Sequence, residues 1–484
     1  MAATTEETVR SFDRLFVGGR WVAPSSDRAI EVISPATENV IAHVAEAREA
    51  DVDAAVSAAR TAFDEGPWPH LEPGRRAAAL RRIKAEIARR IREMSRSFTL
   101  EIGAPIAVSE AFHQGALAMW EGAAQVLERY DFEEERPSDT GTARLRHEPI
   151  GVVGTITPWN APVGNGSIKL APALAAGCTA VLKPAPEGPS SAMLLAEAFE
   201  AADLPEGVVS VLPAGREVGE HLVRHPDVDK VAFTGSTAAG KRIMSLCGER
   251  IARVTLELGG KSAGIIADDI PADEIVPDLV MAGLGHSGQV CAALTRILVP
   301  RHRHEEFATK IAEFMSGIVV GDPTSRDTQL GPLAMERQRQ RVENYVRIGI
   351  AEGASLVTGG QRPAALDRGW FFEPTLFADV NNSMRIAREE IFGPVLCLIP
   401  FDDEDHAVSI ANDSPYGLSG AVYARDIGLA ERIASRLRTG QMWINGWGMC
   451  VTEPFGGFKQ SGLGREGGVE GMSAYLESKY IWRA

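Results

Sequence analysis

The feature of this sequence that most constrains its fold is an alternation of short apolar runs and helical stretches that begins near residue 150. The apolar runs are IGVVGTITP, TAVLKPA, VVSVLPA and DKVAFTG, and between them lie SIKLAPALAAG, SSAMLLAEAFEAA and a helical stretch near 217–224. This order predicts a parallel α/β sheet with right-handed crossovers. Such sheets bind ligands at the carboxyl ends of their strands, so we expect the binding loops at 157–160, 183–187 and 235–240.

A second alternating series starts near residue 262 and predicts a second α/β domain. It includes TRILVP, the helical stretch HEEFATKIAEFMSGI, the strand GAVYA, and the helical stretch GLAERIASRLRTG before QMWING. Two further segments are strand-like but belong to neither series. They are the polar stretch around 130–146 and the C-terminal YLESKYIW. Strands in such positions often pair with another element, for example one from a second subunit.

Composition narrows the classes of function. With 484 residues the chain is too long for one ordinary core, so two or more domains are expected. A formal net charge of −15 disfavours nucleic acid as a partner. The N-terminus has no apolar signal region, and no apolar run reaches membrane-spanning length, so no membrane association is expected. The five cysteines form no CxxC pair and no zinc-like spacing, which favours a cytoplasmic protein without a metal site.

Three glycine-rich stretches resemble nucleotide motifs. Residues 283–288 and 462–467 match Gly-x-Gly-x-x-Gly, but neither has the expected strand, helix and distant acidic residue, so we interpret both as turn glycines. Residues 235–241, GSTAAGK, nearly match a phosphate loop, and the helix that follows could hold a phosphate. Arg242 stands where a magnesium-binding Ser or Thr is needed. A phosphate-loop NTPase is therefore an alternative function.

Glu257 and Cys291 lie 34 residues apart in glycine-rich surroundings, LELGGKS and GQVCAAL. Glycine is useful where backbone must approach a reacting atom. Taken singly, Cys291 is typical of a buried core thiol and Glu257 of a surface carboxylate.

Seven segments in a fixed order change this interpretation. They are TPWN (157–160), LKPAPE (182–187), FTGSTAAGK (233–241), LELGGKS (256–262), GQVC (288–291), EEIFGPV (389–395) and PFGGFKQSGLGRE (454–466). Together they resemble the aldehyde dehydrogenase superfamily, of the NAD(P)-dependent, hydrolytic type, along nearly the whole chain. The resemblance implies the reaction aldehyde + NAD(P)⁺ + water → carboxylic acid + NAD(P)H.

The resemblance also implies an architecture. It is a doubly wound, Rossmann-like α/β cofactor domain (1–127 and 148–258) and a second α/β catalytic domain (259–452). A small β oligomerisation element would combine 128–147 with the C-terminal segment 453–484, in a homodimer or homotetramer.

Catalytic roles carry over onto matching residues. Cys291 resembles the thiolate nucleophile, which forms a thiohemiacetal and then a thioester, and Asn160 resembles the side-chain donor of the oxyanion hole. Glu257 resembles the base that activates water for thioester hydrolysis. Lys169 and Glu466 resemble a proton relay beside this base, although a buried ion pair with a structural role explains them equally well.

The cofactor implied is NAD, with NADP possible. Lys183 resembles the lysine that binds the adenosine ribose, Ser236 a pyrophosphate contact, and Glu390 and Phe392 the residues around the nicotinamide ribose and ring. The remaining residues expected at this site are Ile156, Trp159, Glu187, Gly215, Gly235 and Leu258. One departure concerns the third residue after the lysine, which is Glu in many NAD-using relatives and Pro186 here. Glu187 is the candidate to replace it.

The substrate side also departs from relatives that use short aldehydes. Where they often carry aromatic side chains or Met, this chain has smaller residues, at Ala161, Asn165, Ile168 and Gly285. Apolar side chains would close the outer part of the tunnel, at Trp447, Met449, Val451 and Phe455. We therefore expect medium-to-large apolar aldehydes as substrates.

Two more alternatives stay open within the resemblance. An acylating enzyme would release acyl-CoA, but Glu257 argues against it because only hydrolysis needs that base. A non-catalytic relative would not need Cys291, Glu257 and Asn160 intact.

Overall fold

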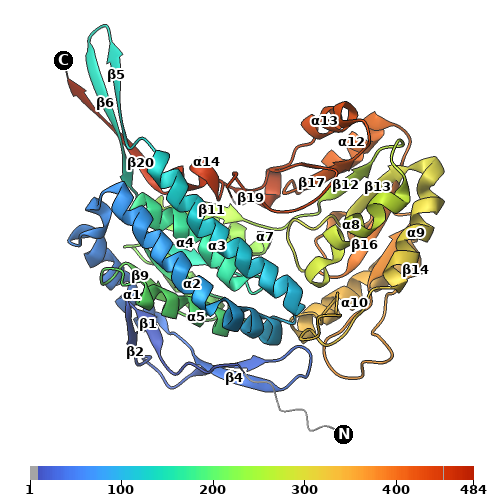
Figure 1. Ribbon diagram of the computed structural model, residues 1–484, viewed down its shortest axis with the longest axis horizontal. Coiled ribbons are helices and arrows are strands. Elements are labelled where there is room, and N and C mark those ends of the chain that lie inside the picture. Colours follow the sequence, from blue (N-terminus) through green and yellow to red (C-terminus); the bar gives the residue numbers. More distant parts are fainter. Residues whose placement is uncertain (1–8, 451, 484) are drawn as a thin grey trace.

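The chain folds into two α/β lobes and a projecting β arm, as a computed structural model shows (Figure 1); the structure describes residues 9–450 and 452–483. Val451, one of the expected substrate residues, lies outside this range. The predicted fold class, two α/β units with parallel sheets, is confirmed.

The first lobe contains an eight-stranded sheet. Its strands lie in the order β19 (Gly462–Leu463), β11 (Arg253–Glu257), β10 (Lys230–Thr234), β7 (Val152–Ile156), β8 (Thr179–Lys183), β9 (Val209–Val211), β1 (Leu15–Val17) and β2 (Arg20–Val22). The five strands from β11 to β9 are parallel. Chain order runs outward from β7 in both directions, which is the doubly wound arrangement.

Helices cover both faces of this sheet. The crossover helices are α4 (Pro162–Ala176), α5 (Pro189–Ala201), α6 (Arg216–Arg224) and α7 (Thr237–Arg250). The long helices α2 (Pro73–Ile102) and α3 (Ile106–Arg129) pack on α4 and α5, and α1 (Glu49–Asp64) packs beside α6. Strands β3 (Ala29–Ile33) and β4 (Val40–Ala45) form a separate pair. Gly177 ends α4 with a φ of 99°, a conformation that favours glycine.

The second lobe contains a seven-stranded sheet. Its strand order is β14 (Ser355–Thr358), β15 (Thr375–Ala378), β16 (Val395–Phe401), β13 (Arg296–Pro300), β12 (Ala263–Ile266), β17 (Gly420–Tyr423) and β18 (Trp443–Ile444). Its helices are α8 (Ala272–Leu284), α9 (His304–Ser316), α10 (Glu336–Ala351), α11 (Arg385–Arg388), α12 (Glu404–Asn412) and α13 (Ile427–Ser435). The segment 258–262 joins β11 of the first sheet directly to β12 of the second.

The arm is a three-stranded antiparallel sheet that projects beside the C-terminus (Figure 1). β6 (Gly141–Pro149) lies between β5 (Glu133–Ser138) and β20 (Leu476–Arg483), so the two stray segments of the sequence pair with each other. The short α14 (Gly468–Ser473) precedes β20, and single turns of 3₁₀ helix occur at Trp68–His70, Gly285–Gly288, Arg301–Arg303 and Lys459–Ser461. Among the described residues, no helix is long and apolar enough to cross a membrane.

One of the expected turn glycines lies elsewhere. Gly283 belongs to α8, not to a turn. A Cβ there would lie 2.5 Å from the Leu396 side chain and 2.8 Å from the Leu294 carbonyl oxygen. Close packing of helix against strand explains this glycine, and a glycine motif alone cannot distinguish such packing from a turn.

Candidate active site

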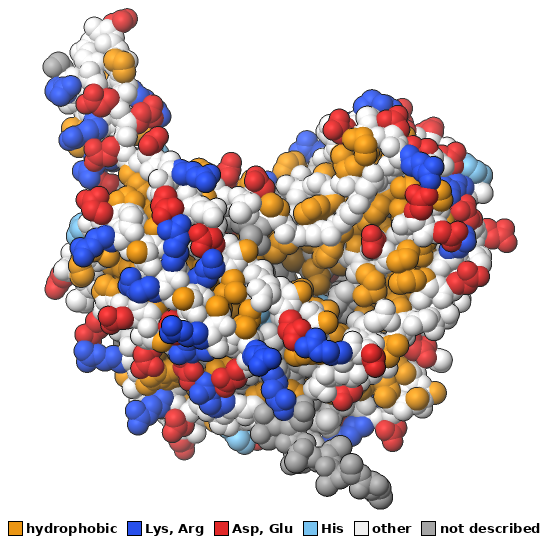
Figure 2. Space-filling view, in the orientation of Figure 1, with side chains coloured by type: hydrophobic (Ala, Val, Ile, Leu, Met, Phe, Trp, Pro, Cys, Tyr) orange, Lys and Arg blue, Asp and Glu red, His pale blue; other side chains and the backbone are white. Residues whose placement is uncertain are grey.

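A cavity of about 730 Å³ lies between the two lobes, and residues of both line it. Figure 2 shows the surface hollowed between the lobes. The first lobe contributes the carboxyl ends of β7, β8, β10 and β11 and the facing parts of α6 and α7. The second contributes Cys291, the start of α10 and the loop around Glu390. The predicted binding loops therefore meet at one site.

Cys291 reaches the cavity from a turn with an unusual backbone. His286, Ser287 and Gly288 have φ values of 54°, 55° and 71°. Left-handed residues other than glycine cost free energy, and they are concentrated at functional sites. The Ser287 hydroxyl donates to the Gly331 carbonyl oxygen at 2.8 Å, which helps to hold this turn. Burial, together with Glu390 and Glu257, raises the pKa of the Cys291 thiol to about 12, so a base must remove its proton.

Glu257 ends strand β11 and is 2% exposed. Neither carboxylate oxygen has a hydrogen-bond partner within the described part of the chain. Burial and the neighbouring Glu466 raise the pKa of Glu257, while Lys169 and Arg465 oppose this shift. A Cβ at Gly456 would lie 2.6 Å from Oε1 of Glu257, so the glycine loop makes room for the carboxylate. An unpartnered carboxylate with a raised pKa is well suited to act as a base.

Asn160 follows strand β7 of the first sheet and forms a hydrogen bond with the turn that precedes Cys291. Its Nδ2 donates to the backbone carbonyl oxygen of Gln289 at 2.9 Å, two residues before Cys291. The side-chain amide has a second N–H, which remains available to an oxyanion. Asn160 and Cys291 line the same cavity, as the oxyanion-hole prediction requires.

Lys169 and Glu466 form a buried ion pair behind Glu257. Lys169 is 0% exposed, contacts Glu466 directly, and donates to the Thr234 hydroxyl at 2.5 Å. Neither residue lines the main cavity. Their charges act on Glu257 in opposite directions, so the pair sets the charge environment of that carboxylate.

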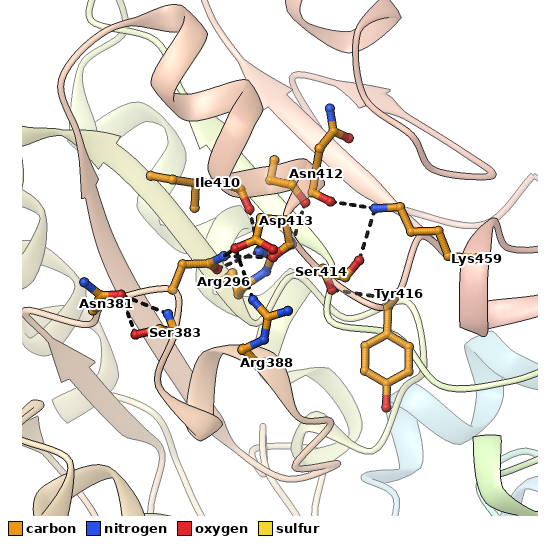
Figure 3. Close-up of polar contacts among 12 residues, drawn as sticks. Arg296, Asn381, Ser383, Arg388, Ile410, Asn412, Asp413, Ser414, Tyr416 and Lys459 are labelled. Carbon is orange, nitrogen blue, oxygen red and sulfur yellow. Dashed lines mark hydrogen bonds and ion pairs between the residues drawn. The ribbon is translucent and has the colours of Figure 1, made fainter.

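A second polar network surrounds the carboxyl end of α12, where Arg296 and Lys459 contact backbone carbonyl oxygens (Figure 3). Arg296, 2% exposed, donates to the backbone carbonyl oxygens of Lys261 at 2.9 Å, Ile410 at 3.0 Å and Ala411 at 2.9 Å. Lys459 donates to the carbonyl oxygens of Asn412 at 2.6 Å and Ser414 at 3.1 Å. These contacts anchor the loop after Glu257 and the segment before β19 to the same helix end, α12.

Most of the expected cofactor residues line the cavity. They are Ile156, Trp159, Lys183, Glu187, Gly235, Ser236, Leu258, Glu390 and Phe392. Gly215 does not; it caps the start of α6, and its neighbour Arg216 lines the cavity instead. The sequence analysis also missed Gln338, Arg337 and Arg341, which lie on α10. Arg337 and Arg341 are exposed and Gln338 is buried, and polar residues in a helical stretch gave no signal that could have identified them.

The cavity can hold a nucleotide with a pyrophosphate group. Ser236 caps α7 by accepting a hydrogen bond from the Ala239 amide at 3.3 Å, and Ala238 and Ala239 line the cavity at this helix start. A helix N-terminus favours phosphate. Lys183 is 5% exposed and donates to the Ala214 carbonyl oxygen at 2.7 Å, which leaves further N–H donors for a ligand. Glu390 accepts from the Gly260 amide at 3.0 Å, and burial raises its pKa to about 7.

Glu187 of the first lobe contacts a residue of the second lobe. It forms an ion pair with Arg337 of α10, which is 150 positions further along the chain. Both side chains line the cavity. The residue expected to bind the ribose thus already has a cationic partner.

An apolar cluster lies on the other side of Cys291. Ile168 and Phe455, both predicted here, pack with Met119, Ala292 and Leu418, and Cys291 and Trp447 pack against them. The Trp447 indole N–H donates to the Ala292 carbonyl oxygen at 3.1 Å, so this ring is fixed beside the thiol. Met119 and Leu418 were missed, since each looks like an ordinary core residue in its own segment.

The other expected substrate residues are placed differently. Asn165 lines the large cavity rather than the apolar cluster, and Met449 is 49% exposed. Ala161 is the residue before α4, partly exposed and outside both the cavity lining and the cluster. Within 9–450 and 452–483, no three His, Cys, Asp or Glu side chains are grouped so that they could hold a metal ion.

Comparisons with known proteins agree with this geometry. The model of the aldehyde dehydrogenase family matches residues 21–481. A geranial dehydrogenase of Castellaniella defragrans is 45% identical over 97% of this chain and 98% of its own length. A 3-succinoylsemialdehyde-pyridine dehydrogenase of a Pseudomonas species is 44% identical over 98% of this chain and 99% of its own.

Solved structures match equally closely. An aldehyde dehydrogenase of Mycobacterium tuberculosis in complex with NAD⁺ has a TM-score of 0.97 and 44% identity, and the match covers 99% of each chain. A cysteine-to-alanine mutant of aldehyde dehydrogenase C from Pseudomonas syringae, in complex with NAD⁺ and octanal, has a TM-score of 0.95 and 43% identity, over 99% of this chain and 98% of that one. The chain belongs to the aldehyde dehydrogenase family. The alternative interpretation of the chain as a phosphate-loop NTPase is therefore wrong.

Proposed function

We propose that this protein oxidises aldehydes to carboxylic acids with NAD⁺, through a thioester on Cys291. The observation that carries the proposal is the arrangement of three residues: Cys291 and Asn160 line the same cavity, and the buried carboxylate of Glu257 is near enough to the Cys291 thiol to raise its pKa. The two solved relatives described above are complexes with NAD⁺, and the cavity of this chain has the helix start and the lysine that suit a dinucleotide.

The chain's own residues account for each step. Glu257 removes the thiol proton, and the Cys291 sulfur then attacks the aldehyde carbon. Asn160 Nδ2 and the backbone N–H of Cys291 stabilise the resulting alkoxide, each donor contributing about 3 kcal/mol. NAD⁺, when bound, supplies the acceptor for the hydride that leaves this carbon. Glu257 releases the thiol proton to solvent and then deprotonates a water molecule, whose oxygen attacks the thioester carbon. The C–S bond breaks, the Cys291 thiolate leaves, and the carboxylic acid is released.

Direct measurement of NADH formation tests the proposal. Purified protein with an aldehyde and NAD⁺ should produce NADH and the free acid without added coenzyme A. Dependence of turnover on coenzyme A would favour the acylating alternative instead, and absence of NADH with every aldehyde would reject the function.

The apolar cluster beside Cys291 predicts a preference for larger aldehydes. Buried apolar contacts around a longer chain stabilise its transition state, so kcat/KM for octanal or hexanal should exceed that for acetaldehyde by at least about tenfold. The relatives named for geranial and crystallised with octanal support this choice. We would measure kcat/KM across acetaldehyde, hexanal, octanal and benzaldehyde. The interpretation fails if acetaldehyde equals or exceeds all the others.

The arm predicts a homodimer or a homotetramer. Tyr480 and Trp482 lie on one face of β20 and are 68% and 45% exposed, which is unusual for aromatic side chains of a monomer. Light scattering should therefore give a multiple of 51.9 kDa. Glu in place of both aromatic residues should shift the mass toward the monomer. A wild-type protein that is monomeric at micromolar concentration would exclude this role of the arm.

We also propose a cytoplasmic location and three structural units. These are a cofactor domain (1–127 and 148–258), a catalytic domain (259–452) and an oligomerisation element (128–147 and 453–484). All five cysteines are free, which suits a reducing compartment.

A further inference from the structure

His286 is a buried histidine that the proposed mechanism does not use. It lies five positions before Cys291, in the turn that carries the nucleophile. Its backbone has a φ of 54°, a left-handed conformation that is uncommon for residues other than glycine. Backbone strain of this kind persists only where surrounding contacts hold it, and it is concentrated at functional sites. The side chain does not line the cavity, so any effect on the reaction must pass through another residue.

The imidazole ring of His286 is enclosed by side chains of the first lobe. Its centroid lies 5.5 Å from that of Phe98 on α2 and 5.7 Å from that of Phe112 on α3. Trp159, the residue before Asn160, packs against the same apolar cluster as these two rings. Burial lowers the pKa of His286 to about 4, so the ring is neutral near pH 7 and has one N–H donor. The ring therefore acts here as a hydrogen-bonding group and not as a charge.

Three hydrogen bonds join His286, Gln289 and Asn160 in a closed ring. The imidazole bonds to the Asn160 backbone, a contact that opposes the lowering of its pKa and therefore has the carbonyl oxygen as acceptor. The His286 carbonyl oxygen accepts from the Gln289 backbone amide at 3.1 Å, and the Gln289 carbonyl oxygen accepts from Asn160 Nδ2 at 2.9 Å. Both the backbone and the side chain of Asn160 are thus tied to the turn that carries Cys291.

The buried side chain of Gln289 fixes the same turn to the second lobe. Its Nε2 donates to the His286 carbonyl oxygen at 3.2 Å, and its Oε1 accepts from the Ala334 backbone amide at 3.0 Å. Toward the first lobe, the turn is linked to Asn160 by the imidazole and by the Gln289 carbonyl oxygen. Loss of the imidazole would leave Asn160 with one of these two links.

We propose that His286 is a positioning residue, which holds the Asn160 amide where it can stabilise the oxyanion formed on the substrate of Cys291. The inference rests on the proposed dehydrogenase function. An oxyanion donor is effective only when it is preorganised, and removal of a whole donor costs about 10² to 10³-fold in kcat. Displacement of the donor should cost less, about 10 to 30-fold. The Lys183 ammonium and the start of α7 belong to other segments of the chain, so NAD⁺ binding should not depend on His286.

The kinetics of His286→Leu test the proposal. This variant keeps an apolar side chain beside Phe98 and Phe112 but cannot donate to the Asn160 backbone. We expect kcat for octanal to fall about 10 to 30-fold, while the KM for octanal and the Kd for NAD⁺, measured by calorimetry, change less than about threefold. His286→Asn retains an N–H donor and tolerates a left-handed backbone, so it should keep kcat within about threefold of wild type. A Leu variant as active as wild type, or an Asn variant no better than the Leu variant, would overturn the proposal.

His113→Leu is the matched control. His113 is also buried, with its pKa lowered to about 4, and its ring lies 5.9 Å from the same Phe98 ring, but it contacts Ser95 and Ser109 instead of the cysteine turn. Its replacement should lower the melting temperature by an amount similar to that of His286→Leu and leave kcat unchanged. An equal fall of kcat in the two variants would reveal a general effect of losing a buried histidine and would overturn the proposal.

A double-mutant cycle identifies the residue through which His286 acts. In an Asn160→Ala background the side-chain donor is absent, so His286→Leu should lower kcat by less than a further threefold or so, about the level of an uncoupled change. An equal loss in both backgrounds would overturn the proposal, because His286 would then act on Cys291 without Asn160. A wild type that forms no NADH with any aldehyde would reject the proposed function, whereas an active wild type that is insensitive to His286→Leu would reject only the positioning role.

Discussion

Replacing Cys291 with alanine should reduce aldehyde oxidation by at least about 10⁴-fold, because no other cysteine of the described residues lines the cavity and could supply a thiolate nucleophile. The fold and NAD⁺ binding should survive, since the change removes one atom at the edge of an apolar cluster. Steady-state NADH formation measures the loss, and calorimetry confirms that the variant still binds cofactor.

Cys450→Ala is the matched control for this variant. Cys450 is exposed and contacts the Thr452 hydroxyl at 3.4 Å, outside the cavity lining. Its removal should leave kcat/KM unchanged. Residual turnover in Cys291→Ala within tenfold of wild type would show that the nucleophile is a different residue.

Replacing Glu257 with glutamine should separate the two halves of the reaction. Water can take up the single thiol proton of the first turnover, so a burst of one equivalent of NADH should appear, and later turnovers should slow by about 10² to 10⁴-fold because the hydrolytic water is not activated. Rapid mixing resolves this burst from the steady state. Glu249→Gln, at the exposed end of α7, is the control and should behave as wild type. A normal steady-state rate in Glu257→Gln would exclude this residue as the base.

The raised pKa of Glu257 adds a pH dependence to this prediction. Only the ionised carboxylate accepts a proton, so the hydrolytic rate should rise as pH increases through the raised pKa and then level off. The Gln variant should lose that rise. A wild-type rate already on its plateau near pH 4.5, the ordinary value for Glu, would contradict the buried environment seen here.

Sequence periodicity predicted the central strands of both sheets because each strand and each helix can be identified from the residues of its own segment. Strands β7, β8, β9 and β10 are buried runs separated by helices, and Gly177 marks the end of α4 through a conformation that glycine favours. Cys291, Glu257 and Asn160 were identified through the order of motifs, and the structure brings Cys291 and Asn160 to one cavity.

The missed contacts depend on segments far apart in the chain. Nothing near Arg337 distinguishes it from other exposed arginines of α10, and only the folded structure shows that it forms an ion pair with Glu187 across the cavity. Met119 and Leu418 likewise join one apolar cluster from two different lobes. Gly215 was expected in the cavity but only caps α6, because the side chains of that helix, not its cap, face the ligand space.

Because of the short strand β19, the surroundings of Glu257 are complete only after residues near the C-terminus have been synthesised. Gly462 and Leu463 pair with Glu257 and Leu256, so the strand that carries the base becomes an internal strand only when residues near the C-terminus arrive. Glu466, which raises the pKa of Glu257, comes from the same late segment. A nascent chain that already contains Cys291, Asn160 and Glu257 therefore still lacks both the strand that covers β11 and the carboxylate that raises the pKa of Glu257.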